Sequence, residues 1–145
     1  MNIIVDIDGT IADCRHRRHF VTNGNHDWKS FYESMVEDKP IESIVKVVNL
    51  MWCAGNTIIL TTGRPDQYFN HTTEWLYKNE ISFNAIRMRR EYDYREDSIV
   101  KEEMLQELIA KFGKIDLAID DRQPVVDMWR RNGIICLQNS MKELP

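Results

Sequence analysis

Two closely spaced carboxylates follow the first apolar stretch of the chain. Asp6 and Asp8 belong to the sequence Asp-Ile-Asp-Gly-Thr, and alternate residues of an extended segment point to the same side, so both side chains are expected to project together. A second pair, Asp120 and Asp121, follows another apolar stretch. Clustered acids repel one another and raise their pKa values unless a cation lies between them. Carboxylate oxygens suit Mg2+, so we predict a magnesium site; acids that only cap helices or face water are the alternative.

A second group of residues could hold an anion. Thr62, Gly63 and Arg64 end another apolar stretch and precede an expected helix, where a hydroxyl, backbone N–H groups and a guanidinium can bind phosphate. A turn that needs Gly63 explains the same residues equally well. Lys101 lies in the first turn of a further expected helix, where the helix dipole disfavours a cation, so a nearby anion or carboxylate cluster would explain it. A solvated lysine paired with a neighbouring glutamate is the alternative.

Elements that position these residues alternate along the chain. Short apolar stretches at residues 2–7, 57–61, 85–88, 115–119 and 134–138 predict buried parallel strands. Helices are expected around residues 44–51, at 67–78, at 98–112 and between Pro124 and Gly133. This alternation predicts an α/β fold with a doubly wound, Rossmann-like parallel sheet. Ligands of such sheets bind beyond the carboxyl ends of the strands, where the acids are expected.

Bulk properties restrict the class of protein. With 145 residues, the chain suits a single domain spanning 1–145. A net charge of −4 argues against binding to nucleic acid by bulk charge alone. Three widely spaced cysteines favour a reducing compartment, and no apolar run approaches the length of a membrane span. We expect a cytoplasmic protein without a membrane partner, acting in the host cytoplasm if it is phage-encoded; the oligomeric state is open.

Taken in order, these motifs resemble those of the haloacid dehalogenase superfamily. The first motif is Asp6-Ile-Asp-Gly-Thr, the second Thr62, the third Lys101 and the fourth Asp120-Asp121. The resemblance implies that Asp6 attacks phosphorus, that Asp8 is the general acid and base, and that Thr62 and Lys101 bind the phosphoryl group. It also implies Mg2+ held by Asp6, the backbone carbonyl of Asp8 and one member of Asp120-Asp121. An acid two positions after the nucleophile is typical of the phosphatases and mutases in that superfamily, and Asp8 therefore favours hydrolysis.

A narrower resemblance concerns the 3′-phosphatase domain of phage-type polynucleotide kinase. It is carried by Arg89, by residues 95–103, and by residues 118–122 and 125–131. It implies that Arg64 and Arg89 help to bind phosphate and that Asp97 supports Lys101. Further substrate contacts are expected from Thr10, Gly63 and Arg122. A GxxxxGK[ST] phosphate loop does not occur in the sequence, so we expect no ATP-binding kinase half in this chain.

The segment at residues 13–40 departs from that resemblance and is expected to form at most a small cap or flap. Its cluster of Arg15, Arg17 and Arg18, with Trp28 and Tyr32, could receive a nucleic-acid end and stack a base. The cluster could equally close over a small phosphorylated metabolite. It could also consist of solvated arginines around an aromatic residue of the core, and for Trp28 we favour this core position. The other tryptophans, Trp52, Trp75 and Trp129, are expected in the core, and the histidines show no metal-ligand spacing.

Three functions follow from the sequence. The first is Mg2+-dependent hydrolysis of a phosphomonoester through an aspartyl phosphate, with a terminal 3′-phosphate of nucleic acid as the substrate. The second is a nucleoside monophosphatase or another small-molecule phosphatase. The third is a catalytically silent phosphate- or nucleic-acid-binding module. The partner is accordingly a phosphorylated nucleic-acid end or a nucleotide, and the choice between DNA and RNA is open.

Overall fold

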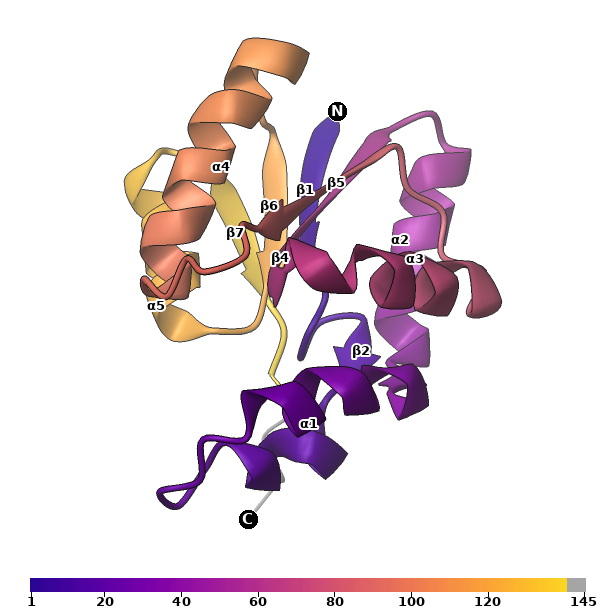
Figure 1. Cartoon of the computed structure of the whole chain (residues 1–145). Helices are drawn as coiled ribbons and strands as arrows, with labels where there is room; N and C mark the ends of the chain where they lie inside the picture. The colour runs from indigo at the N-terminus through magenta and orange to yellow at the C-terminus, as the bar shows by residue number, and fades with distance from the viewer. Residues whose placement is uncertain (141–145) are drawn as a thin grey trace.

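A five-stranded parallel sheet forms the centre of the computed structural model, which describes residues 1–140 (Figure 1). Its order is β5-β4-β1-β6-β7. The strands are β1 (Asn2–Asp6), β4 (Thr57–Pro65), β5 (Ala85–Arg89), β6 (Leu117–Asp120) and β7 (Ile135–Gln138). All four neighbouring pairs are parallel. The expected doubly wound α/β fold is therefore confirmed, and residues 141–145 of the expected domain lie outside the described part.

Helices cover both faces of this sheet (Figure 1). They are α2 (Glu42–Cys53), α3 (Phe69–Lys78), α4 (Asp97–Phe112) and α5 (Gln123–Arg131). Residues of α2 and α3 share one apolar cluster, and residues of α4 and α5 share the other. The strand β1 supplies both clusters, because Ile3 and Val5 face the first and Ile4 faces the second. This alternation follows from the two-residue period of a strand and fixes the direction in which the next residues point.

One helix start differs from the expectation. The strand β4 continues to Pro65, beyond the expected residue 61, and a 3-10 turn η3 (Asp66–Tyr68) precedes α3. Thr62, Gly63 and Arg64 therefore belong to the strand, with an irregular register between Thr62 and Pro65. The helix begins at Phe69, so the helix N-terminus does not directly follow these three residues as expected.

A small excursion leaves the sheet after β1. It comprises β2 (Ala12–Asp13), η1 (Arg15–Phe20), α1 (Trp28–Glu33), η2 (Ser34–Glu37) and β3 (Lys39–Pro40). The strands β2 and β3 pair in antiparallel fashion and close the excursion at its base. Figure 1 shows α1 lying beyond the end of β1 that is opposite the N-terminus, which is the carboxyl edge of the sheet.

The four tryptophans divide evenly between core and surface. Trp75 and Trp129 are 2% and 0% exposed, as expected. The expectation was wrong for Trp28 and Trp52, which are 50% and 42% exposed. Trp28 lies on α1, whose six residues all keep part of their surface accessible, and Trp52 lies near the end of α2. Within residues 1–140, no helix combines the length and apolar character needed to cross a membrane.

Candidate active site

Three carboxylates converge at the carboxyl ends of two neighbouring strands. Asp6 ends β1 and Asp120 ends β6, and the register that pairs Val5 with Ile119 sets the two acids side by side. With Asp121, they offer ligand atoms that all lie within 4.8 Å of one another. The structure therefore brings together three of the four acids that the sequence singled out.

Lys101 enters this cluster from α4. Its Nζ donates hydrogen bonds to Asp6 Oδ1 at 2.6 Å and to Asp120 Oδ2 at 2.9 Å, and its side chain is 3% exposed. Burial opposes the charge on Lys101, but Asp120 and Asp6 outweigh burial and raise its pKa. The alternative of a solvated lysine paired with a glutamate is wrong, since Glu103 pairs with Arg95. The carboxylate cluster explains why a cation is tolerated near the start of this helix.

One lysine does not balance three acids. Burial and the charge of Asp120 raise the pKa of Asp6 well above its usual value, although Lys101 partly offsets this. Burial and Asp120 likewise raise the pKa of Asp121. A cluster with this excess of negative charge is suited to a cation.

The two members of the Asp120-Asp121 pair differ in their contacts. Asp120 accepts hydrogen bonds on both oxygens: Oδ2 from Lys101 and from Trp129 Nε1 at 3.1 Å, and Oδ1 from the Asp121 N–H at 2.9 Å. Asp121 Oδ1 is buried and lacks a hydrogen-bond partner among the described residues. Such an orphaned acceptor is costly unless a cation or water satisfies it, so the donor set fits a metal ion.

Asp8 does not join this cluster, because two arginines hold it. Arg64 Nη2 donates to Asp8 Oδ1 at 2.6 Å, and Arg17 Nη2 donates to the same oxygen at 2.7 Å. Both arginine side chains are 0% exposed, whereas that of Asp8 is 23% exposed. Burial disfavours the ionised form of Asp8, yet Arg64 and Arg17 outweigh burial and lower its pKa to about 2.

A further buried acid, Asp38, completes this arrangement and was missed by sequence reasoning. Arg17 donates to Asp38 from Nε at 2.8 Å and from Nη2 at 2.7 Å, and Arg64 Nη2 lies 3.2 Å from Asp38 Oδ2. His16 Nε2 lies 2.7 Å from Asp38 Oδ1. We call Asp8, Asp38, Arg17 and Arg64 the clamp. Asp38 belongs to an adjacent acidic pair, Glu37-Asp38, some twenty residues after the basic stretch, and this spacing alone does not relate it to Asp8.

The remaining predicted residues divide between two places. Thr10 Oγ1 donates to Asp6 Oδ2 at 2.9 Å, and the buried Thr62 accepts from the Arg64 N–H at 3.1 Å. Arg89 and Arg122 instead converge on Asp97 at the start of α4. Their expected roles in binding substrate, like those of Gly63 and Arg64, stay predictions, as does the support of Lys101 by Asp97.

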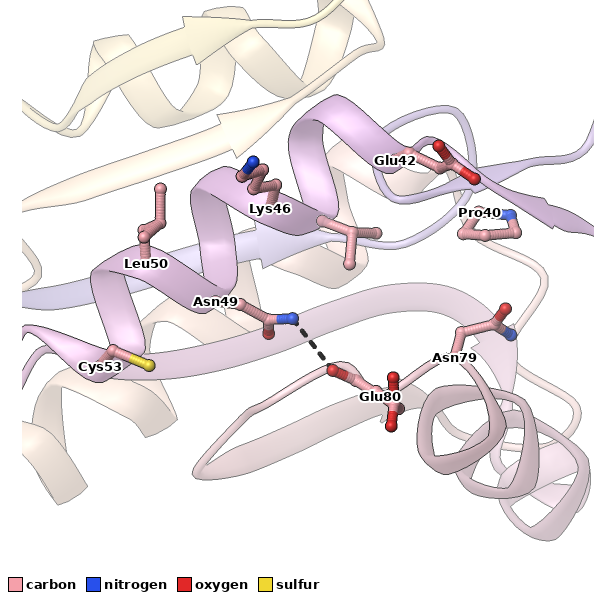
Figure 2. Close-up of a pocket in the computed structure, with 9 residues that line it drawn as sticks. Pro40, Glu42, Lys46, Asn49, Leu50, Cys53, Asn79 and Glu80 are labelled. Carbon is pink, nitrogen blue, oxygen red and sulfur yellow. Dashed lines mark hydrogen bonds between the residues drawn. The ribbon is translucent and has the colours of Figure 1, made fainter.

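A groove lies away from these acids. It encloses about 390 Å3 between α2 and the residues that follow α3. Figure 2 shows Asn49 reaching across it, where its Nδ2 donates to the Glu80 carbonyl at 3.0 Å. Cys53 and Leu50 line the same groove, which contains none of the residues predicted to perform chemistry. We therefore place the candidate active site at the carboxyl edge of the sheet.

Known proteins match this chain over nearly its whole length. Residues 1–143 match the family described as the polynucleotide kinase PNKP phosphatase domain. A solved chain of the Pnkp1/Rnl/Hen1 complex is similar, with 28% identity and a TM-score of 0.76 over 99% of this chain and 47% of that one. A second, from the Pnkp1/Rnl/Hen1 RNA repair complex, has 29% identity and a TM-score of 0.74 over 94% and 41%.

A class C acid phosphatase from Bacillus anthracis shares the fold, at 15% identity and a TM-score of 0.67 over 97% of this chain and 67% of that one. The chain spans less than half the length of the two solved chains from the repair complexes. Because the family match extends over residues 1–143, the chain belongs to the polynucleotide kinase PNKP phosphatase-domain family and is a phosphatase of the haloacid dehalogenase superfamily.

Proposed function

We propose that this chain is a Mg2+-dependent phosphomonoesterase that removes a terminal 3′-phosphate from nucleic acid through an aspartyl phosphate on Asp6. The observation that carries the mechanism is the separation of the two acids of the first motif. Asp6 lies in the carboxylate cluster with Lys101, whereas Asp8 is held by Arg17 and Arg64. We further propose a single domain at residues 1–145, with residues 13–40 as its small cap.

The residues divide the reaction into two steps. In the first, a carboxylate oxygen of Asp6 forms a bond to phosphorus while the bond from phosphorus to the ester oxygen breaks, and Asp8 gives its proton to that oxygen. In the second, Asp8 takes a proton from water, which attacks the phosphorus of the aspartyl phosphate and releases phosphate and the Asp6 carboxylate. Lys101 stabilises the phosphoryl oxygens, and the Thr10 hydroxyl orients Asp6.

The metal would be held by Asp6, Asp121 and the backbone carbonyl of Asp8. The orphaned Oδ1 of Asp121 favours this member of the pair as the direct ligand, since both oxygens of Asp120 already accept hydrogen bonds. When bound, Mg2+ neutralises negative charge on the carboxylates and on the phosphoryl oxygens. Asp120 would then serve chiefly to hold Lys101 in place.

The proposed substrate rests on the family and on the surface beside the site. The family is named for a polynucleotide kinase phosphatase, and one similar chain comes from an RNA repair complex. Two exposed arginines of η1, Arg15 and Arg18, lie in the same 3-10 helix as Arg17 of the clamp. Positive side chains beside the site favour a polyanion over a phosphomonoester that carries no further negative charge.

The experiment compares phosphate release from matched esters. We expect a 3′-phosphorylated oligonucleotide to be preferred over the 5′-phosphorylated form and over 3′- and 5′-mononucleotides, with activity lost in chelator and restored by Mg2+. Asp6→Asn should lower turnover by at least about a thousandfold, because an amide is a poor nucleophile. Asp127→Asn, a change on the exposed surface of α5, is the matched control and should keep full activity. Preference for a 5′-mononucleotide, or substantial turnover by Asp6→Asn, would contradict the proposal.

A further inference from the structure

A ladder of aromatic rings lies in the small cap. The rings of Trp28 and Tyr32 stack at 6.0 Å with an interplanar angle of 26°. The ring of Tyr32 lies 5.1 Å from that of Tyr68, tilted by 31°. We call Trp28, Tyr32 and Tyr68 the aromatic ladder. It joins α1 of the cap to η3, the turn that follows β4.

This ladder is not a buried core. Trp28, at its outer end, is 50% exposed, and both tyrosines keep part of their surface accessible. Met35 of η2 is a fully buried apolar residue in this part of the cap. Packing the cap onto the sheet therefore leaves a large aromatic surface in water, which is unfavourable for the fold alone.

The ladder is physically connected to the site. Arg17 lies over the ring of Phe31, with Cζ 4.4 Å from the ring centroid, and its Nη2 donates to Asp8 at 2.7 Å. The ring of Phe31 packs edge-on against that of Trp28 at 5.6 Å. At the inner end, burial and the nearby charge of Asp8 raise the pKa of Tyr32 to about 12. Through Phe31 and Arg17, the ladder is thus connected to Asp8, and Trp28 forms its exposed outer end.

We infer that Trp28 is a stacking platform for the nucleobase of the terminal nucleotide whose phosphate enters the site. The inference rests on the proposed function and deepens it by naming a residue that recognises a nucleotide end. An indole ring binds a base through its π-face and tolerates every base, so recognition would be independent of sequence. A substrate with a base would then gain binding that a bare phosphate ester does not.

The surroundings favour nucleic acid over a protein partner. Arg15 and Arg18 are exposed residues of η1, and Arg15 pairs with Asp13 at 2.8 Å. The hydrogen bond from the Asp27 N–H to the Phe20 carbonyl, at 2.9 Å, links the end of η1 to the start of α1. Positive side chains beside exposed aromatics are typical of single-strand binding, in which arginines contact the backbone and rings stack on bases.

The test compares two 3′-phosphorylated oligonucleotides that differ only in whether the terminal nucleotide carries a base or is abasic. For each protein variant, the measured quantity is the ratio of kcat/KM for the base-bearing substrate to that for the abasic one. We expect Trp28→Ala to lower this ratio about tenfold, in line with the loss of one base stack. Trp28→Phe should restore most of it. Trp52→Ala removes another exposed tryptophan, from α2, and should leave the ratio unchanged.

A second measurement does not depend on hydrolysis. Binding of the same oligonucleotides without their phosphate is measured for wild type and Trp28→Ala, and the variant should lose about tenfold in affinity only for the base-bearing strand. If wild type binds in this way but releases no phosphate from either substrate, the proposed function fails and the stacking site stands. The inference would be overturned if Trp28→Ala kept the wild-type ratio and affinity, or if it lost activity and affinity equally for the base-bearing and the abasic strand. The ladder would then be a surface for a protein or a packing element.

Discussion

Replacing Asp38 by asparagine tests whether the clamp holds Asp8 by balanced charge. Asp8 and Asp38 together balance Arg17 and Arg64, and the side chains of Asp38 and both arginines are 0% exposed. Asp38→Asn keeps the shape but leaves one buried positive charge without its counterion. Breaking a buried ion pair in this way costs about 3–5 kcal/mol. For a chain of this length, we therefore expect the Tm to fall by roughly 10 °C.

The assay is denaturant unfolding at neutral pH, followed by circular dichroism, for wild type, Asp38→Asn and the surface control Asp127→Asn. The control should change the free energy of unfolding by less than about 0.5 kcal/mol. Asp38→Asn should also lower kcat, because Arg17 and Arg64 would no longer fix Asp8. A loss of stability below about 1 kcal/mol for Asp38→Asn would refute the claim that charge balance holds the clamp, since it would fall well short of a broken buried pair.

Two further predictions concern Gly9 and Asp8. Gly9 has φ of +84°, and a Cβ at this position would collide with the Asp121 carboxylate. We therefore expect Gly9→Ala to raise the Mg2+ concentration at which phosphate release reaches half its maximal rate. An unchanged Mg2+ requirement would argue against Asp121 as a metal ligand. The folded-state pKa of Asp8, about 2, lies below its unfolded value, so its stabilising contribution is present above about pH 4 and is lost as pH falls toward 2. The free energy of unfolding, measured in urea, should fall between pH 5 and pH 2.5 by about 2 kcal/mol less in Asp8→Asn than in wild type. Equal decreases in the two proteins would contradict the lowered pKa of Asp8.

The sheet and the carboxylate cluster were predictable because their signals are local. Apolar stretches set the strands, and acids directly after Val5 and Ile119 must appear at the same edge of a parallel sheet. The clamp could not be predicted in this way. Arg17 lies in the short 3-10 helix η1, and Asp38 is the single residue between η2 and β3, so neither belongs to a segment with clear periodicity. The pairing of β2 with β3 returns the chain to the site. The exposure of Trp28 was missed for a related reason: a six-residue helix has no hydrophobic pattern that marks its outer face.

Asp6 and Asp8 lie two residues apart in opposite electrostatic surroundings. Burial and Asp120 raise the pKa of Asp6, so the proposed nucleophile needs positive charge beyond Lys101 to be ionised, which is a reason for the cluster to bind a cation. Arg64 and Arg17 overcome burial and keep Asp8 ionised, although a general acid must carry a proton. A phosphate dianion entering beside Asp8 changes this balance, because like charge raises the pKa of Asp8 and competes for its guanidinium partners. Under the proposed mechanism, the clamp therefore lets Asp8 gain its proton when substrate is bound and keeps it charged when the site holds none.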